Sequence, residues 1–62
     1  MLFQIGEKVR DSRRDSRLIG VAEVIARERT KINGEWTYVY LVTDSANLTH
    51  SREHWELRSA DK

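Results

Sequence analysis

The 62-residue chain has no cysteine and no proline, and only three glycines. Without cysteine it has neither a disulfide framework nor a thiolate metal site, and without proline no segment is a Pro-rich linker. No apolar run approaches the ~20 residues that cross a bilayer. The first residues, MLFQIGEKV, lack the basic region and long apolar core of a secretory signal. We therefore expect a cytoplasmic protein without membrane contact, folded as one domain over residues 1–62.

The excess of one sign of charge over the other is also small, because 11 basic and 10 acidic residues leave a net charge of +1. The net charge therefore gives little support for a dominant polyanionic partner. The basic residues are nevertheless clustered in two motifs, VRDSRRDSRL and RERTK. A solvated loop or strand end is the ordinary interpretation of such runs.

The strongest local signal is Asn33-Gly34 in the motif INGEW. This dipeptide is typical of a two-residue type I′ hairpin turn, whose central residues both need positive φ. We therefore predict a long, bent strand over residues 18–31, with a bulge near Gly20 or Ala22-Glu23, and a partner strand over residues 35–43. An amphipathic helix over LIGVAEVIARER is the alternative, but three β-branched residues and the missing N-cap argue against it.

Shorter elements complete the predicted fold. Strands are expected from near Glu7, over residues 48–50 and over residues 55–58, with a turn over residues 44–47 and one helical turn capped by Ser51. Residues 11–17 are polar and without periodicity, which indicates a mobile Arg-rich loop, and residues 59–62 are expected to fray. The sequence thus predicts an all-β protein, a five-stranded SH3-like small barrel with a short 3-10 turn before the last strand.

The predicted strand over residues 35–43 has apolar side chains on both faces. In the preferred register Val39 and Leu41 face the core, and Trp36, Tyr38 and Tyr40 point outward. The core side chains that we expect to join them are Val9, Ile25, Leu48 and Leu57. Two alternatives stay open: residues 1–3 or Trp55 cover the rings, or the register is reversed and the rings lie inside.

Several motifs resemble the bacterial SH3-like small barrels: FQIGEKVR, GVAEVI, YVYLV followed by Asp44, and EHWEL. KOW-type domains of transcription and translation proteins, which engage RNA or proteins, are similar through Gly6, Val9, Gly20 and Ala22. Hemimethylated-DNA-binding domains are similar through FQIG, LIGV and W-x-Y-V, although their acidic, Pro-bearing insert is absent here. The resemblance covers Phe3 to Leu57, and its motifs determine a fold more than a function.

Two further groups share parts of the same pattern. The small SH3-like accessory subunits of photosystem I and of the photosynthetic NDH complex are similar at both ends, and they are docking subunits. Plasmid-type dihydrofolate reductases share the first motif and the barrel, but their Val-Gln-Ile-Tyr stretch is missing here.

An outward aromatic strand beside an Arg-rich loop would form a binding surface. Bases stack on such rings while guanidinium groups neutralise phosphates, and the same residue types are enriched at protein interfaces. The predicted contact residues are Arg13, Arg14, Arg17, Trp36, Tyr38 and Tyr40.

We therefore expect a non-catalytic binding module, with nucleic acid placed first as its ligand. The alternative is a protein-docking or inhibitor subunit, such as a phage or mobile-element accessory protein. A third possibility is an oligomeric enzyme resembling the plasmid-type reductases. A homo-oligomer would fit each of them, because it buries the aromatic strand.

No metal, cofactor or catalytic residue is predicted. His50 and His54 lie four residues apart with Glu53 nearby, but two histidines do not complete a tetrahedral site. The sequence contains neither a nucleophile–base pattern nor a Gly-rich phosphate loop.

Overall fold

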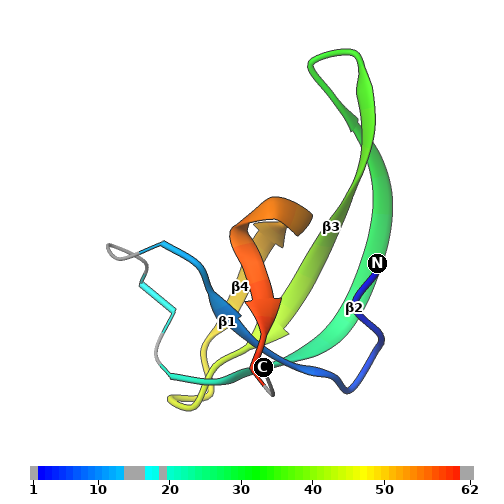
Figure 1. Cartoon of the computed structure of the whole chain (residues 1–62). Helices are drawn as coiled ribbons and strands as arrows, with labels where there is room; N and C mark the ends of the chain where they lie inside the picture. The colour runs from blue at the N-terminus through cyan, green and yellow to red at the C-terminus, as the bar shows by residue number, and fades with distance from the viewer. Residues whose placement is uncertain (1, 14–16, 19, 61–62) are drawn as a thin grey trace.

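The computed structural model describes residues 2–13, 17–18 and 20–60, which fold as an antiparallel sheet with a 3-10 turn before its last strand. The elements are β1 (Lys8–Asp11), β2 (Ala22–Ile32), β3 (Glu35–Thr43), β4 (Thr49–Glu53), η1 (His54–Glu56) and β5 (Leu57–Ser59). The five strands lie in the order β4-β3-β2-β1-β5 (Figure 1). The all-β prediction is confirmed. Among the described residues no hydrogen-bonded pairing joins β4 to β5, so these strands are the two edges of the sheet.

The hairpin between β2 and β3 forms where the sequence predicts it. Asn33 and Gly34 both have positive φ, 51° and 82°, as a type I′ turn requires, and Ile32 pairs directly with Glu35. The bend in β2 comes from a register shift between Val24 and Ala26, a little beyond the predicted positions. The helix alternative for this segment is therefore wrong.

The two long strands extend beyond the rest of the sheet. Along β2, β1 pairs only with Ala22 and Glu23, and along β3, β4 pairs only from Val39 to Thr43. The segments on either side of the turn, residues 27–38, therefore project as a two-stranded hairpin arm (Figure 1).

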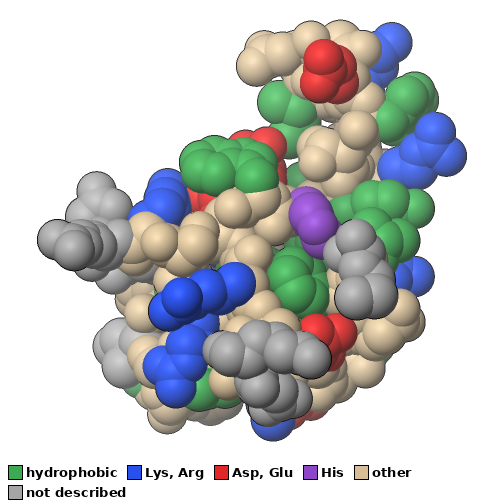
Figure 2. All heavy atoms as spheres, in the orientation of Figure 1, with side chains coloured by type: hydrophobic (Ala, Val, Ile, Leu, Met, Phe, Trp, Pro, Cys, Tyr) green, Lys and Arg blue, Asp and Glu red, His purple; other side chains and the backbone are tan. Residues whose placement is uncertain are grey.

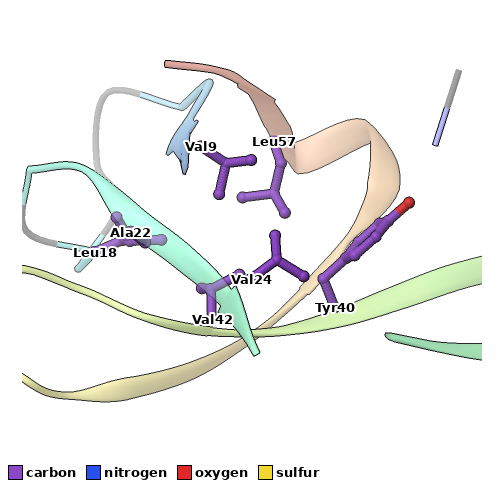
Figure 3. Packing of buried hydrophobic residues seen from close by; sticks show 7 residues of the cluster. All are labelled: Val9, Leu18, Ala22, Val24, Tyr40, Val42 and Leu57. Carbon is purple, nitrogen blue, oxygen red and sulfur yellow. The ribbon is translucent and has the colours of Figure 1, made fainter. Parts of the chain in front are cut away.

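The core lies where β1, β2, β3 and β5 face one another. Figure 3 shows Val9, Val24 and Leu57 pointing toward one another, while Tyr40 lies at the margin with its hydroxyl directed away from them. The buried hydrophobic residues are Val9, Leu18, Ala22, Val24, Tyr40, Val42 and Leu57.

The predicted register of β3 is wrong. Tyr40 is 0% exposed, whereas Leu41, predicted to lie in the core, is 39% exposed. The core face holds Tyr40 and Val42 because Val42 pairs with the buried Val24, and neighbours in a strand point to opposite faces.

Two more predicted core residues lie outside. Ile25 is 43% exposed because it lies within the register shift of β2, and Leu48 is 53% exposed in the turn before β4. The predictions for Val9 and Leu57 are confirmed, since both are buried.

The N-terminal segment covers the Tyr40 ring. The Phe3 ring lies edge-on to Tyr40, with centroids 5.4 Å apart at 70°, and 5.0 Å from the His54 ring. The Phe3 N–H donates to Tyr40 Oη at 3.3 Å, and a 3.0 Å hydrogen bond joins that hydroxyl to His54 Nδ1. The reversed register of the second alternative therefore holds at Tyr40, and Phe3 supplies the covering that the first alternative expected. Trp55 remains 63% exposed.

The C-terminal elements are shifted from their predicted positions. Ser51, the predicted helix cap, lies within β4 opposite Leu41, and η1 begins three residues later at His54. Its first turn is held by Glu56 Oε1, which accepts from the Glu53 N–H at 2.8 Å.

The end of the chain is paired rather than frayed at residues 59 and 60. Ser59 pairs with Val9 in the β1–β5 ladder, and the Ala60 N–H donates to the Lys8 carbonyl at 3.0 Å. The last part of the predicted frayed tail, residues 61–62, lies outside the described residues. In the described part of the chain no helix has the length and apolar character needed to cross a membrane.

Candidate nucleic-acid interface

One face of the hairpin arm combines basic and aromatic side chains. Residues directly opposite each other in an antiparallel pair share a face of the sheet. The ladder pairs three cations with three rings in this way: Arg27 with Tyr40, Arg29 with Tyr38, and Lys31 with Trp36.

The cations lie over the rings of the arm. Arg29 Cζ is 4.6 Å and Lys31 Nζ 5.9 Å from the Trp36 ring centroid, and Arg27 Cζ is 5.6 Å from that of Tyr38. Trp36 is 60% exposed, and Tyr38 is half-buried against the core. Figure 2 shows basic and hydrophobic side chains together along the upper right of the molecule, where the arm projects. The name aromatic–cation face is used below for the five residues of these contacts: Arg27, Arg29, Lys31, Trp36 and Tyr38.

The acidic side chains of the arm lie on its other face. Glu28 stands between Arg27 and Arg29 and is paired with Val39, while Glu35 precedes Trp36 and is paired with Ile32. Because the side chains of a strand alternate, both carboxylates point away from the aromatic–cation face. The arm therefore separates its charges by face, which the net charge of +1 for the whole chain conceals.

Arg27 also fixes the boundary of this face. Its Nη1 donates to the Phe3 carbonyl oxygen at 3.1 Å, and Phe3 covers Tyr40. The core face of β3 thus continues along the arm, where it passes from the covered Tyr40 to the half-buried Tyr38 and the exposed Trp36.

The predicted Arg-rich loop has a different arrangement from the one expected. Arg13 forms ion pairs with Asp11 at 3.3 Å and with Glu56 at 2.8 Å. The Asp11 carboxylate, 3% exposed, also accepts from Arg52 Nε at 3.0 Å. Arg13 therefore ties the end of β1 to η1, which gives it a structural role.

The structure places Arg13 against Asp11 and Glu56 and not beside the arm rings. The end of β1, after which Arg13 follows, lies on the other side of Figure 1 from the hairpin tip. Arg17 is exposed, and Arg14, with the rest of residues 14–16, lies outside the described residues.

The cations of the aromatic–cation face were not predicted as contact residues, although the sequence contains the signal. A two-residue turn at Asn33-Gly34 makes residues 32 and 35 a pair, and each step outward then places residue 31 opposite 36 and residue 29 opposite 38. Register counted outward from the turn therefore assigns the three cations of RERTK to the same face as the rings.

The two histidines have separate partners. His50 Nε2 lies 2.7 Å from Oδ2 of Asp44, whose side chain is 0% exposed, and His54 is bonded to Tyr40. Asp44 Oδ1 also accepts from the Ala46 and Leu48 N–H groups at 3.0 and 2.9 Å, so this carboxylate organises the turn before β4. Within the described ranges no group of three or more His, Cys, Asp or Glu residues is placed to hold a metal ion.

No protein-family model, curated protein sequence or solved structure matches this chain. The function is therefore inferred from the hairpin arm and its chemistry.

Proposed function

We propose that this protein is a non-catalytic nucleic-acid-binding module whose contact surface is the aromatic–cation face of the hairpin arm. The observation that supports this most strongly is the separation of charges: Arg27, Arg29 and Lys31 share one face with the rings of Trp36 and Tyr38. Cations on a projecting ribbon attract phosphates, and exposed rings offer stacking surfaces worth ~1–3 kcal/mol per base.

The frame that carries the arm is proposed to be an SH3-like small barrel. The strand order β4-β3-β2-β1-β5 and the 3-10 turn between β4 and β5 support this, as does the resemblance of FQIGEKVR and YVYLV to that group. Two of the resembling families, the KOW-type and hemimethylated-DNA-binding domains, engage nucleic acid. In this proposal Tyr40 belongs to the frame, and the rings that contact the nucleic acid are those of Trp36 and Tyr38.

Binding of this kind depends on salt by a predictable amount. Each neutralised phosphate contributes about 0.7 to the slope of log K against log [salt] for a single strand, and about 0.9 for a duplex. Three cations therefore give a slope of about −2 to −2.7. A fourfold rise in salt would then weaken binding roughly 16- to 40-fold.

The test is fluorescence anisotropy of a labelled mixed-sequence oligonucleotide over a series of salt concentrations. Arg29→Gln should reduce the steepness of the slope by about 0.7 to 0.9, because it removes one phosphate contact. Arg58→Gln is the matched control, since it removes the same charge from β5, at an exposed position outside the arm. It should leave the slope unchanged.

The predicted loop is tested in the same experiment. Arg17→Gln should reduce affinity if the exposed Arg17 is a further phosphate contact outside the arm, and its effect should be smaller than that of Arg29→Gln.

The proposal fails if the folded protein binds neither single strands nor duplexes at low salt. A protein-docking role is indicated instead if a cell-lysate partner survives nuclease treatment, binds with little salt dependence, and is lost with Trp36→Ala.

A further inference from the structure

We infer that the aromatic–cation face takes unpaired nucleic acid, with bases stacked on Trp36 and Tyr38. This inference rests on the proposed function and names the class of ligand. In a duplex the flat faces of the bases are covered by their neighbours, so the exposed Trp36 ring and the half-buried Tyr38 ring would have no base to stack on. A single strand can turn its bases out and offer them to both rings.

The spacing of the two rings fits an extended strand. Trp36 and Tyr38 lie two residues apart on β3 and on one face, a separation of about 6.8 Å along the strand. Successive nucleotides of a duplex strand are about 3.4 Å apart along the axis. The rings therefore match a strand stretched to about twice that spacing, with its bases no longer stacked on each other.

The cations are placed to follow the phosphates of such a strand. Arg29 and Lys31 are opposite Tyr38 and Trp36 in the ladder, and Arg29 now lies 4.6 Å over the Trp36 ring. An exposed cation–ring contact is weaker than the stacking of a base on the same ring. A base can therefore displace the guanidinium, which is then free to pair with the adjacent phosphate.

Within the part of the chain that the structure describes, cations lie over exposed or half-buried rings on the arm. Trp55 is also exposed, at 63%, but it lies on η1 outside the arm, next to Glu56, whose carboxylate is paired with Arg13 at 2.8 Å. Trp55 is therefore an internal control for an exposed indole that lies outside the aromatic–cation face.

The experiment is a fluorescence titration of the Trp55→Phe variant, in which Trp36 is the sole indole. The probes are a short oligothymidine, a duplex of the same length, and a single strand of the same length whose sugars carry no bases. We expect the oligothymidine to quench Trp36 and to bind about tenfold more tightly than either other probe. Equal affinity for the abasic strand or the duplex, with Trp36 unquenched, would overturn the inference while nucleic-acid binding stands.

Two variants separate stacking from charge. Trp36→Ala should weaken oligothymidine binding by about 5- to 140-fold and leave the salt slope unchanged, whereas Thr37→Ala, on the opposite face, should change neither. The Trp36→Ala variant should remain folded, because Trp36 is 60% exposed and lies outside the core. An equal loss by Trp36→Ala on the abasic strand would show that no base is stacked and would overturn the inference. Failure of all three probes to bind would instead overturn the proposed function.

Discussion

Replacing Phe3 with alanine tests whether the N-terminal segment completes the core. The Phe3 ring contacts Tyr40 and His54 with centroid separations of 5.4 and 5.0 Å, and its N–H donates to the Tyr40 hydroxyl. Phe3→Ala removes the ring and uncovers Tyr40, which is otherwise 0% exposed. The backbone hydrogen bond is not removed directly by this change.

The expected loss follows from the burial of the ring. Truncation of a fully buried phenylalanine costs about 3–5 kcal/mol, and Phe3 is half-buried, so we expect about 2 kcal/mol. A chain of 62 residues has a total stability of roughly 3–9 kcal/mol at the usual value per residue. The variant should therefore lose a large share of its stability, with a Tm lower by about 8–16 °C.

The assay is thermal unfolding followed by circular dichroism, with Ile5→Ala as the control. Ile5 is apolar, only two residues away, and 60% exposed, so its truncation should change the unfolding free energy by less than about 0.5 kcal/mol. If Phe3→Ala and Ile5→Ala have the same small effect, the Phe3 ring does not cover Tyr40 in solution, and the assignment of Tyr40 to the core loses its support.

Two further predictions concern turns. Gly34→Ala should lower the unfolding free energy by about 1 kcal/mol, because φ is +82° but no atom lies within 4 Å of the new Cβ. Gly20→Ala should lower it more, because φ is +66° and the Cβ would come 2.6 Å from Ser45 Oγ. The opposite order in urea unfolding would contradict this. Asp44→Ala removes a buried acceptor of two backbone N–H groups and the partner of His50, and should lower the unfolding free energy by about 2–3 kcal/mol. Asp44→Asn, which keeps a carbonyl acceptor, should lose less, and equal losses in urea unfolding would deny the role of these hydrogen bonds.

Much of the fold was predictable because its main signals are local. Asn33-Gly34 specifies the turn through backbone conformations that few other residues adopt. The turn then sets the β2–β3 pairing. The order of elements and the short helical turn follow from the alternation of apolar runs with polar turns. Their boundaries were displaced by up to four residues, because pairing with distant strands, such as β4 with β3, decides where each element ends.

The choice of the core face was not predictable from the strand itself. Both faces of β3 are apolar, and the face that becomes core is covered by Phe3, which lies 37 residues before Tyr40. The register shift at Ile25 also reverses the alternation along β2. In the same way, the sequence places Arg13 among the contact residues of a mobile loop, because its partner Glu56 is distant in sequence.

The most direct test of the account is the nuclear magnetic resonance spectrum of the two tryptophan indole N–H groups during titration with a short oligothymidine. Trp36 and Trp55 are exposed to nearly the same extent, 60% and 63%, so each is equally free to respond to a ligand. The account predicts that the Trp36 signal shifts with added oligonucleotide, along with the backbone signals of Arg27, Arg29 and Tyr38, while the Trp55 signal stays in place. Shifts of Trp55 in place of Trp36, or shifts confined to residues outside the hairpin arm, would contradict it.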